Sequence, residues 1–310
     1  MVKPEPPAAA RVALVTGAGT GLGRAYALRL AADGLRVVVN NRRREVDADG
    51  RGSADRVVDE IRTAGGVAVA DYEDVAAPGA GERMVARALS EFGRLDALVN
   101  NAGVDQHAPF HRIGLDEFRA IFDVNFYGTL AVTHAAWAHM RGAGHGRVIV
   151  SASSAGLHGL HGLSAYAASK AALIALARSL AQEGASRDLF CNAIAPYAAT
   201  RMTGAHVSAE EQVVMAPERV APLVSALVSA HSRLNGLVLV VGHGVARRAA
   251  TIECEPLVPV SGADLADASA QRFGGLLDLP GVGREFADAL SAFHDFSARA
   301  KGLASAADPA

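Results

Sequence analysis

This sequence of 310 residues lacks features that several classes of protein require. Its two cysteines, Cys191 and Cys254, are too few for a disulfide framework and lack the spacing of a metal site. No apolar stretch reaches the roughly 18 residues that cross a bilayer. Residues 1–10 have no apolar centre, which a signal peptide needs. We therefore expect a protein of the reducing cytoplasm, with no membrane partner and no metal.

Charge of one sign is also lacking. A net charge of −2 provides no field that would gather nucleic acid, so we expect no nucleic-acid partner. The 32 glycines and 12 prolines follow no period, which excludes a collagen-like or solenoid protein. Half of the residues are hydrophobic and a fifth are charged, a balance that supports a buried core rather than disorder. The composition indicates one large globular domain.

Short β-rich runs alternate with longer helical patterns over residues 10–250. This alternation is typical of βαβ units on a parallel sheet. The runs Val37–Val39 and Val238–Val241 are continuously apolar, as strands covered by helices on both faces are. The pattern predicts an α/β fold with a doubly wound, Rossmann-type parallel sheet. We expect about seven strands, at residues 11–16, 36–40, 67–70, 95–100, 147–151, 189–194 and 237–241.

Two helical patterns carry further expectations. Ser53 is placed to cap a helix that stops at Gly65. Its predicted buried face consists of Ala54, Val57, Val58 and Ile61. The pattern from Ser164 to Gln182 is apolar on most of its faces, which predicts a deep core helix or a subunit interface. A homodimer or homotetramer is the expected assembly.

The alternation ends at residues 242–244, and we expect residues 251–310 to form a C-terminal extension. An amphipathic pattern predicts a helix from about Arg284, with Phe286, Leu290 and Phe293 on one face and Phe296 extending it. Such a helix packs on the body of the protein or on a partner subunit.

A glycine-rich turn, TGAGTGLGRA, follows the first predicted strand and opens a helix. Glycines let the backbone turn tightly and approach a pyrophosphate, whose charge is met by the amides at the helix start. A mere tight turn is the alternative, but the position between a strand and a helix favours a dinucleotide site. The expected cofactor residues here are Gly17, Gly19, Thr20, Gly21, Leu22 and Gly23.

The second predicted strand ends in the sequence NNRRR. An acidic side chain usually accepts the 2′-hydroxyl of NAD at this place, but here the residue is Asn41. Arg42 or Arg43 could pair with the 2′-phosphate of NADP through charge-assisted hydrogen bonds. We therefore favour NADP and keep NAD as possible. In the alternative interpretation, the arginines form a solvated loop face paired with Glu45 and Asp47.

A set of polar side chains predicts proton-transfer chemistry. Tyr166 and Lys170 are four residues apart and share a helix face. A lysine charge about 4 Å from the phenol would favour phenolate by roughly 4 kcal/mol and bring the pKa of Tyr166 to about 7. Ser153 could donate to a substrate carbonyl, and Asn125, in the helical stretch 121–140, could hold a water on a path to Lys170. Singly, each has a mundane alternative: a surface serine, a buried tyrosine, a solvated lysine or a capping asparagine.

These residues resemble the short-chain dehydrogenase/reductase family. The glycine-rich turn is similar to its cofactor loop, and NNAG at 100–103 is similar to its sheet-stabilising motif. Asn125, Ser153, Tyr166 and Lys170 resemble its catalytic tetrad. The resemblance, over residues 10–250, implies hydride transfer between a nicotinamide cofactor and a ketone or secondary alcohol, with tyrosine as general acid/base. It also implies cofactor contacts by Asp71, Tyr72, Asn101, Ala102, Gly103, Tyr166, Lys170, Pro196, Thr200 and Met202.

A closer likeness is to the (3R)-hydroxyacyl-CoA dehydrogenase part of peroxisomal multifunctional enzyme type 2 and its bacterial relatives. It is carried by GLGRAYAL at 21–28, NAIAP at 192–196 and VAPLV at 220–224. In that group the chain beyond the sheet helps to form the dimer and can cover the neighbouring active site. The likeness implies such a role for residues 251–310, and a 3-hydroxyacyl thioester as one alternative substrate.

Three residues are expected to shape the substrate pocket. The family's usual Pro-Gly is Pro196–Tyr197 here, so Tyr197 is expected to project towards the substrate. His158 and His161 lie on a glycine-rich segment without a companion acid, which favours pocket lining over metal binding. A substrate lid is expected over residues 200–215. A non-catalytic module that senses the dinucleotide is the remaining alternative to an enzyme.

Overall fold

The computed structural model describes residues 10–42, 46–199, 208–254 and 283–307. Its main feature is an eight-stranded sheet with the order β3-β2-β1-β4-β5-β6-β7-β8. All pairs from β3 to β7 are parallel. The strands are β1 (Val12–Val15), β2 (Arg36–Asn40), β3 (Ala68–Asp71), β4 (Ala97–Asn100), β5 (Gly146–Ser151), β6 (Leu189–Pro196), β7 (Val238–Gly242) and β8 (Val245–Ala249).

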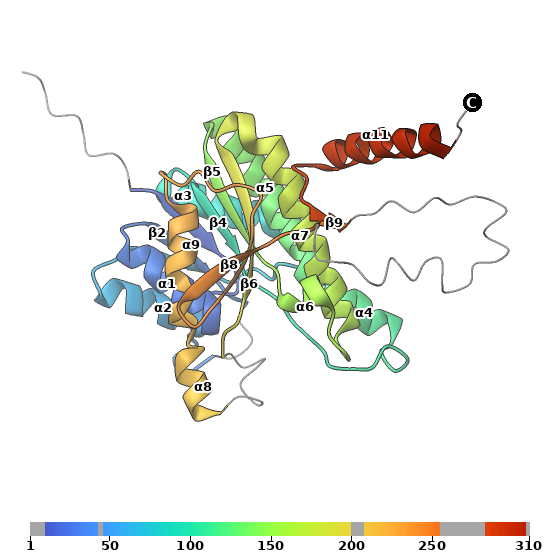
Figure 1. Ribbon diagram of the computed structural model, residues 1–310. Helices are drawn as coiled ribbons and strands as arrows, with labels where there is room; N and C mark the ends of the chain where they lie inside the picture. Colours follow the sequence, from blue (N-terminus) through green and yellow to red (C-terminus); the bar gives the residue numbers. More distant parts are fainter. Residues whose placement is uncertain (1–9, 43–45, 200–207, 255–282, 308–310) are drawn as a thin grey trace, which may run out of the picture. The chain divides into compact units, whose positions relative to one another are not determined.

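Helices cover both faces of this sheet, with α1, α2 and α9 on one face and α3, α5 and α7 on the other (Figure 1). The α-helices are α1 (Gly21–Ala32), α2 (Ser53–Thr63), α3 (Ala80–Phe92), α4 (Leu115–Phe122), α5 (Thr129–Ala143), α6 (Ser154–His158), α7 (Ser164–Gly184), α8 (Ala209–Val214) and α9 (Ala221–Val228). The predicted doubly wound α/β fold is confirmed. In the described part of the chain, no helix is both long and apolar enough to cross a membrane.

The strand order reverses between β1 and β4, because the chain builds outwards to β3 and then returns past β1. Ligands of open α/β sheets bind at such a switch point, outside the carboxyl ends of the strands. Every residue of β1 and β4 is buried, and in β2 Val37–Val39 are buried as their unbroken apolar run predicts. The core of these strands fixes the edge from which the loops of the site emerge.

The eighth strand was not predicted. His243 and Gly244 join β7 to β8 and have φ angles of +54° and +79°. A two-residue loop with positive φ at both positions is a type I′ hairpin turn, so β8 runs antiparallel to β7. The sheet therefore has one strand more than the seven that the sequence located. Val245–Arg248 are exposed, so no buried face marked this strand in the sequence.

Helix α2 confirms the predicted buried face but not the predicted cap. Ala54, Val57, Val58 and Ile61 are all buried. The cap position is Gly52, whose N–H donates to the Asp55 carboxylate at 2.7 Å. Ser53 is instead the first helical residue, and its hydroxyl accepts the Asn41 amide at 2.7 Å. The serine is displaced from the cap because Asp55, three residues after the cap, satisfies the backbone there.

Helix α7 is buried on one side only. Leu173, Ile174 and Ala177 are buried, whereas Ala168, Ala171 and Ala175 are exposed. The small exposed alanines made the sequence look apolar on most faces, although only one face lies in the core.

A cluster of charges lies at the amino end of the parallel strands. Arg147, near the start of β5, is buried, and its guanidinium contacts an Asp188 carboxylate oxygen at 2.9 Å. It also stacks on Phe190, 4.2 Å from the ring centre. His145 donates from Nδ1 to Asp188 at 2.7 Å, because its Nε2 accepts from Arg11 at 3.4 Å and arginine has no acceptor. This cluster ties the starts of three strands together.

The chain divides into two compact units, Met1–Arg248 and Ala249–Ala310. In the second unit, β9 (Glu253–Cys254) pairs antiparallel with β10 (Gly283–Arg284), and α11 spans Ala289–Ala307. The predicted start of this helix at Arg284 is wrong. Asp288 caps it, accepting the Ser291 N–H at 2.7 Å.

The predicted apolar stripe of α11 is exposed in part. Phe286 precedes the helix, while Leu290, Phe293 and Phe296 lie on it and are each more than half exposed. Arg284 in β10 pairs with Asp295 of the helix at 2.9 Å. The ion pair holds the strand against the helix within this unit.

Candidate active site

The glycine-rich loop between β1 and α1 has no room for side chains at key positions. Gly17 has a φ of +62°, and a Cβ there would lie 2.8 Å from Ala102 Cα. A Cβ on Gly23 would lie 2.3 Å from the Gly17 carbonyl oxygen. Thr20 occupies the cap position of α1 without capping it, and the first turn of the helix carries no acidic residue. The loop and helix start therefore fit the pyrophosphate of a dinucleotide.

The floor of this loop is tied to the end of β4. The Thr16 hydroxyl accepts the N–H groups of Asn101 at 3.0 Å and Ala102 at 3.1 Å. The Asn101 amide donates to the carbonyls of Thr16 and Gly17, at 3.2 and 3.1 Å. Thr16 was missed as a site residue, although it stands at the end of the first predicted strand and opens the glycine-rich turn. These bonds fix the glycine loop across the switch point.

The residues after β2 are held by two neighbouring segments. The Asn41 amide donates to Ser53, whose hydroxyl oxygen would lie 2.2 Å from a Cβ on Gly19. Arg42 pairs with Asp74 after β3, with Nη1 and Oδ2 3.0 Å apart. The alternative interpretation paired the arginines with Glu45 and Asp47, whereas the acid that the structure shows beside Arg42 is Asp74. Arg43 and Glu45 lie outside the described residues.

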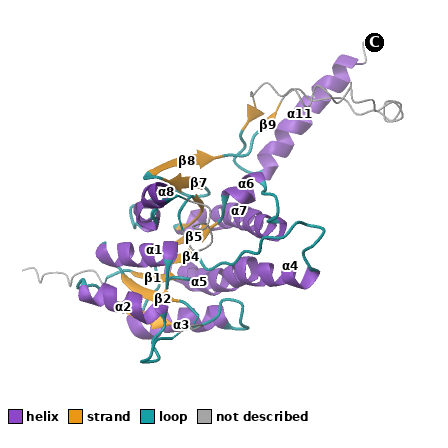
Figure 2. Cartoon of the chain, turned by 90° about the horizontal axis from the view of Figure 1, so that it is seen from below, coloured by secondary structure: helices purple, strands orange, loops and turns teal. Residues whose placement is uncertain are grey.

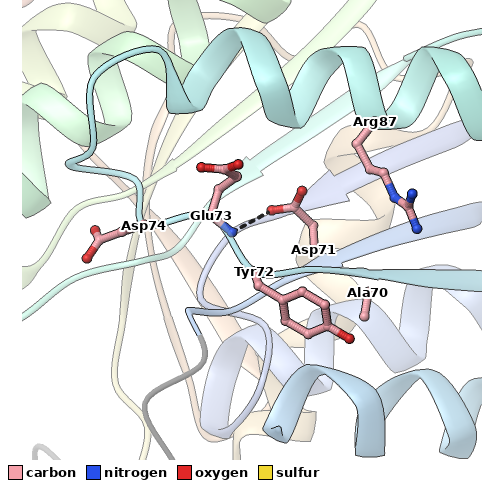
Figure 3. Close-up of a pocket in the computed structure, with 6 residues that line it drawn as sticks. All are labelled: Ala70, Asp71, Tyr72, Glu73, Asp74 and Arg87. Carbon is pink, nitrogen blue, oxygen red and sulfur yellow. Dashed lines mark hydrogen bonds between the residues drawn. The ribbon is translucent and has the colours of Figure 1, made fainter. Parts of the chain in front are cut away.

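The segment after β3 forms one wall of a cavity of about 410 Å³. Figure 3 shows the side chains that line it, which are Ala70, Asp71, Tyr72, Glu73, Asp74 and Arg87. The Asp71 carboxylate accepts the Asn40 amide at 2.7 Å and the Glu73 N–H at 3.1 Å. The Tyr72 hydroxyl donates to Asp55 of α2. Asp71 and Tyr72 are thus positioned at the same end of the sheet as the glycine loop.

The structure brings three of the predicted proton-transfer residues together. Ser153 caps the short helix α6, accepting the Ala155 N–H at 3.1 Å. Ser153 also interacts with the Tyr166 side chain, and this interaction lowers the pKa of the phenol. Lys170 lies one turn further along α7, with its Nζ 5.6 Å from the centre of the Tyr166 ring. The Lys170 ammonium donates to the Ser151 carbonyl, the last residue of β5, at 2.7 Å.

The pKa of Tyr166 shifts in the direction opposite to the sequence prediction. Burial raises the pKa of Tyr166, the bond with Ser153 lowers it, and the negative charge of Asp105 raises it again, with a net increase. Burial also lowers the pKa of Lys170 from 10.5 to about 8. The prediction considered only the attraction between the two groups, and burial weakens the charged form of each.

Asn125 lies in a π-helical turn, η1 (Asp123–Gly128), between α4 and α5, which lie in line in Figure 2. It is fully buried, and its amide is bonded to both backbone groups of Val104, at 2.8 and 2.9 Å. It also donates to the Ser169 hydroxyl at 3.1 Å. A Cβ on Gly103 would lie 3.3 Å from the Asn125 oxygen and 3.4 Å from the Lys170 ammonium. Asn125 and Lys170 therefore both lie next to the backbone of Gly103. Ser169, the partner of Asn125, was not among the predicted site residues.

The predicted substrate residues are spread over separate loops. His158 ends α6 and His161 follows it, and both are exposed. Tyr197 is 39% exposed, and its N–H donates to Val241 at 2.7 Å, extending the pairing of β6 with β7. A Cβ on Gly242 would lie 2.8 Å from Tyr197 Cβ, so the glycine gives the tyrosine room.

The remaining predictions concern the expected lid, Pro196, metal binding and the cysteines. Thr200 and Met202, like residues 200–207 of the expected lid, lie outside the described residues. Pro196 is half-buried at the end of β6.

Within the described ranges, no group of three His, Cys, Asp or Glu residues is placed to hold a metal ion. Cys191 is buried, which raises its pKa to about 12.

Comparison with known proteins assigns the family. The sequence model of the short chain dehydrogenases matches residues 11–213. The chain belongs to the short-chain dehydrogenase/reductase family. A short-chain type dehydrogenase/reductase of Mycobacterium tuberculosis is 43% identical over 242 residues, covering 77% of this chain and 85% of that protein. As a member of this family, the protein is an oxidoreductase.

Two further relatives differ in length and in name. Peroxisomal multifunctional enzyme type 2 of Mus musculus is 43% identical over 236 residues, which are 76% of this chain but 32% of that enzyme. This chain therefore spans about a third of the mouse enzyme. A 3-oxoacyl-[acyl-carrier-protein] reductase of Synechocystis is 40% identical over 195 residues, covering 63% of this chain and 76% of that reductase.

Solved structures agree with this assignment. A short-chain dehydrogenase from Mycobacterium avium superimposes with a TM-score of 0.74 at 38% identity, covering 88% of this chain and 95% of the other. An NAD(P)-dependent gluconate 5-dehydrogenase from Beutenbergia cavernae, solved with NADP bound, has a TM-score of 0.68 at 33% identity. It covers 76% of this chain and 97% of its own.

Proposed function

We propose that this short-chain dehydrogenase/reductase uses a nicotinamide dinucleotide to interconvert a ketone and a secondary alcohol, with Tyr166 as general acid and base. The observation that carries this proposal is the arrangement of Tyr166 between the Ser153 hydroxyl and the Lys170 ammonium. A hydroxyl donor and a phenol side by side suit a carbonyl oxygen that becomes an oxyanion. When bound, the dinucleotide supplies or accepts the hydride.

Each residue of the set has a role in this proposal. The raised pKa of Tyr166 keeps the phenol protonated at neutral pH, so it is ready to donate a proton to the oxyanion formed in ketone reduction. Ser153 orients the carbonyl through its hydroxyl. Lys170 holds the ribose of the dinucleotide and favours the phenolate when the reaction runs as an alcohol oxidation. Asn125 supports a water on the path to Lys170.

The dinucleotide would be held along the carboxyl ends of β1 to β4 and by residues after β6. We propose that the proton-transfer pair also contributes to this binding. The proposed set is Gly17, Gly19, Thr20, Gly21, Leu22, Gly23, Asn41, Arg42, Asp71, Tyr72, Asn101, Ala102, Gly103, Tyr166, Lys170, Pro196, Thr200 and Met202. His158, His161 and Tyr197 are the proposed substrate residues.

NADP is the favoured cofactor and NAD a second one. Asn41 presents no carboxylate to repel a 2′-phosphate, and Arg42 is the neighbouring cation. The gluconate 5-dehydrogenase with bound NADP supports this choice. The neutral amide of Asn41 also leaves room for the 2′-hydroxyl of NAD.

The alternative substrate is a 3-hydroxyacyl or 3-oxoacyl thioester. The likeness to the 3-oxoacyl-[acyl-carrier-protein] reductase and to the multifunctional enzyme supports it. A cytoplasmic location, a homodimer or homotetramer, and a role for residues 251–310 in covering the site or the dimer contact belong to the same proposal.

The test is oxidation of NADPH and NADH by the purified protein against 3-oxoacyl thioesters and bulky cyclic ketones. Turnover that falls at least about 100-fold in Tyr166→Phe, with dinucleotide binding retained, supports the enzyme and the role of the phenol. Binding of the dinucleotide without turnover of any ketone would favour the non-catalytic sensing module instead. Turnover of cyclic ketones but not of thioesters would remove the thioester alternative.

A further inference from the structure

The site that would receive the adenosine ribose contains an acid that is not part of the proposed cofactor set. Asp74 follows β3 and pairs with Arg42 at the end of β2 through one contact, Nη1 to Oδ2 at 3.0 Å. Both side chains are about one-third exposed, at 28% and 39%, so a ligand from solvent can reach either. The pair lies beside the cavity that Figure 3 shows, where Asp74 is one of the lining residues.

Arg42 is the only one of the three consecutive arginines that the structure describes, and its position is fixed by its neighbours. The preceding residue, Asn41, is bonded through its N–H to the Asp71 carbonyl at 3.0 Å and through its amide to Ser53 at 2.7 Å. Ser53 in turn touches the place where Gly19 would carry a side chain. Arg42 therefore follows directly from a residue anchored against the phosphate loop, and in the proposed dinucleotide site we expect its guanidinium near the adenosine ribose.

We propose that Asp74 is a specificity-determining residue that competes with the 2′-phosphate of NADP for Arg42 and so keeps NAD usable as a second cofactor. The inference rests on the proposed dinucleotide site. An arginine bound to a carboxylate must exchange or share that partner to bind a phosphate, and the phosphate also meets the carboxylate's like charge. The 2′-hydroxyl of NAD is neutral and meets no such repulsion.

The neighbouring acids do not share this role. Glu73 is bonded to Arg83 of α3 by two contacts, at 2.7 and 2.8 Å. Asp71 accepts from Asn40 and from the backbone. Asp55 accepts from Tyr72 and from the Gly52 N–H. Of these acids, Asp74 alone is paired with a residue of the segment after β2, as far as the described residues show.

The experiment measures binding of two adenosine fragments by calorimetry, so it does not depend on knowing the substrate. Adenosine 2′,5′-bisphosphate and AMP differ only in the 2′-phosphate. We expect Asp74→Asn to tighten the bisphosphate about ten-fold, the effect of gaining one charge-assisted contact, and to change AMP less than about two-fold. Glu73→Gln is the matched control, because it removes the same charge one residue away, and it should leave the ratio of the two affinities unchanged.

A variant without Arg42 shows whether Asp74 acts through this arginine. In Arg42→Gln, the bisphosphate should bind more weakly than in the wild type. Adding Asp74→Asn to this variant should tighten binding clearly less than ten-fold, because only the repulsion by the carboxylate is then removed. An unchanged ratio in Asp74→Asn, or an equal gain in the Arg42→Gln background, would overturn the inference while leaving the dinucleotide site standing. Failure of the wild type to bind either fragment would instead overturn the dinucleotide site, and the inference with it.

Discussion

A buried cation lies at each end of strand β5, and the two cations differ in their hydrogen-bond and ion-pair partners. Arg147, near the start of the strand, is bonded to the Asp188 carboxylate at 2.9 Å and to four backbone carbonyls. Lys170 lies against Ser151, the last residue of the strand, with a carbonyl as its hydrogen-bond acceptor at 2.7 Å. No ion pair to Lys170 is present among the described residues. One cation is neutralised by its partner, and the other keeps an unbalanced charge.

The difference separates stability from chemistry. Burial raises the pKa of Asp188, but its bonds from His145 and Arg147 outweigh this and lower it, as expected for a carboxylate held in a stabilising cluster. The pKa of Lys170 is lowered to about 8 by burial alone. A buried charge without a partner opposes folding, and such groups are typical of functional sites. The following changes test this distinction.

The largest effect is expected at the carboxyl end of the strand. Lys170→Met removes the ammonium next to Tyr166, so turnover should fall about 1,000-fold, the upper range for a group that assists proton transfer and cofactor binding. The same change removes a desolvated charge, so the variant should unfold at a higher urea concentration than the wild type at pH 7. Steady-state rates and urea unfolding measure the two effects. A variant that is both inactive and less stable would show that Lys170 is a structural residue.

The second effect is a dependence of stability on alkaline pH. The pKa of Lys170 is about 8 when folded and 10.5 when unfolded, so below pH 8 both states are protonated and the penalty of burial is complete. Between pH 8 and 10.5 the unfolded state binds more protons, so stability rises with pH. Relative to Lys170→Met, the wild type should gain about 3 kcal/mol across this window. Urea titrations of both proteins at several pH values measure it, and a constant difference would contradict the assigned pKa.

The third effect is expected at the amino end of the strand. Asp188→Asn leaves the Arg147 guanidinium buried without its carboxylate, which should lower the free energy of unfolding by about 2 kcal/mol. Asp188 has a φ of +51°, a conformation that asparagine also tolerates, so the backbone is not disturbed. Turnover at low temperature should stay within about two-fold of the wild type, because the cluster lies at the opposite end of the strands from the site. A large loss of turnover in a folded variant would show that the Arg147–Asp188 cluster contributes to catalysis and not to stability alone.

The smallest effect concerns Asp105, whose charge contributes to the raised pKa of Tyr166. Asp105→Asn should lower that pKa, so alcohol oxidation, which needs the phenolate, should reach half its maximum at a lower pH than in the wild type. Because Asp105 is exposed, the shift should shrink as salt is added. Asp116→Asn, an exposed acid of α4 paired with Arg119, is the control and should leave the profile in place.

The features that the sequence predicted well depend on local patterns. Apolar runs predicted the covered strands, and the four-residue spacing placed Tyr166 and Lys170 on one face of α7. The glycine loop was found because a tight turn between a strand and a helix requires glycines, which are visible in the sequence. These signals lie within one turn or one strand, where the period of the backbone decides which side chains meet.

What could not be predicted depends on contacts between distant segments. Asp74 reaches Arg42 only because β3 pairs with β2, and nothing in the sequence links Asp74 to the run of arginines. Ser53 was expected to cap α2 because the tie to Asn41 is invisible in the local pattern. The direction of the Tyr166 pKa was missed because it depends on burial, which spacing does not report. The antiparallel strand β8 was missed because it has no buried face.

That added strand changes which parts of the molecule are available for self-assembly. With β8 in place, the terminal strand on this side is a short, exposed one that carries Arg247 and Arg248, and β7 has no free edge. In the described part of the chain, a second copy that approaches this side of the sheet therefore meets β8 and not β7. Pairing between the β7 strands of two subunits would require β8 to leave its place first.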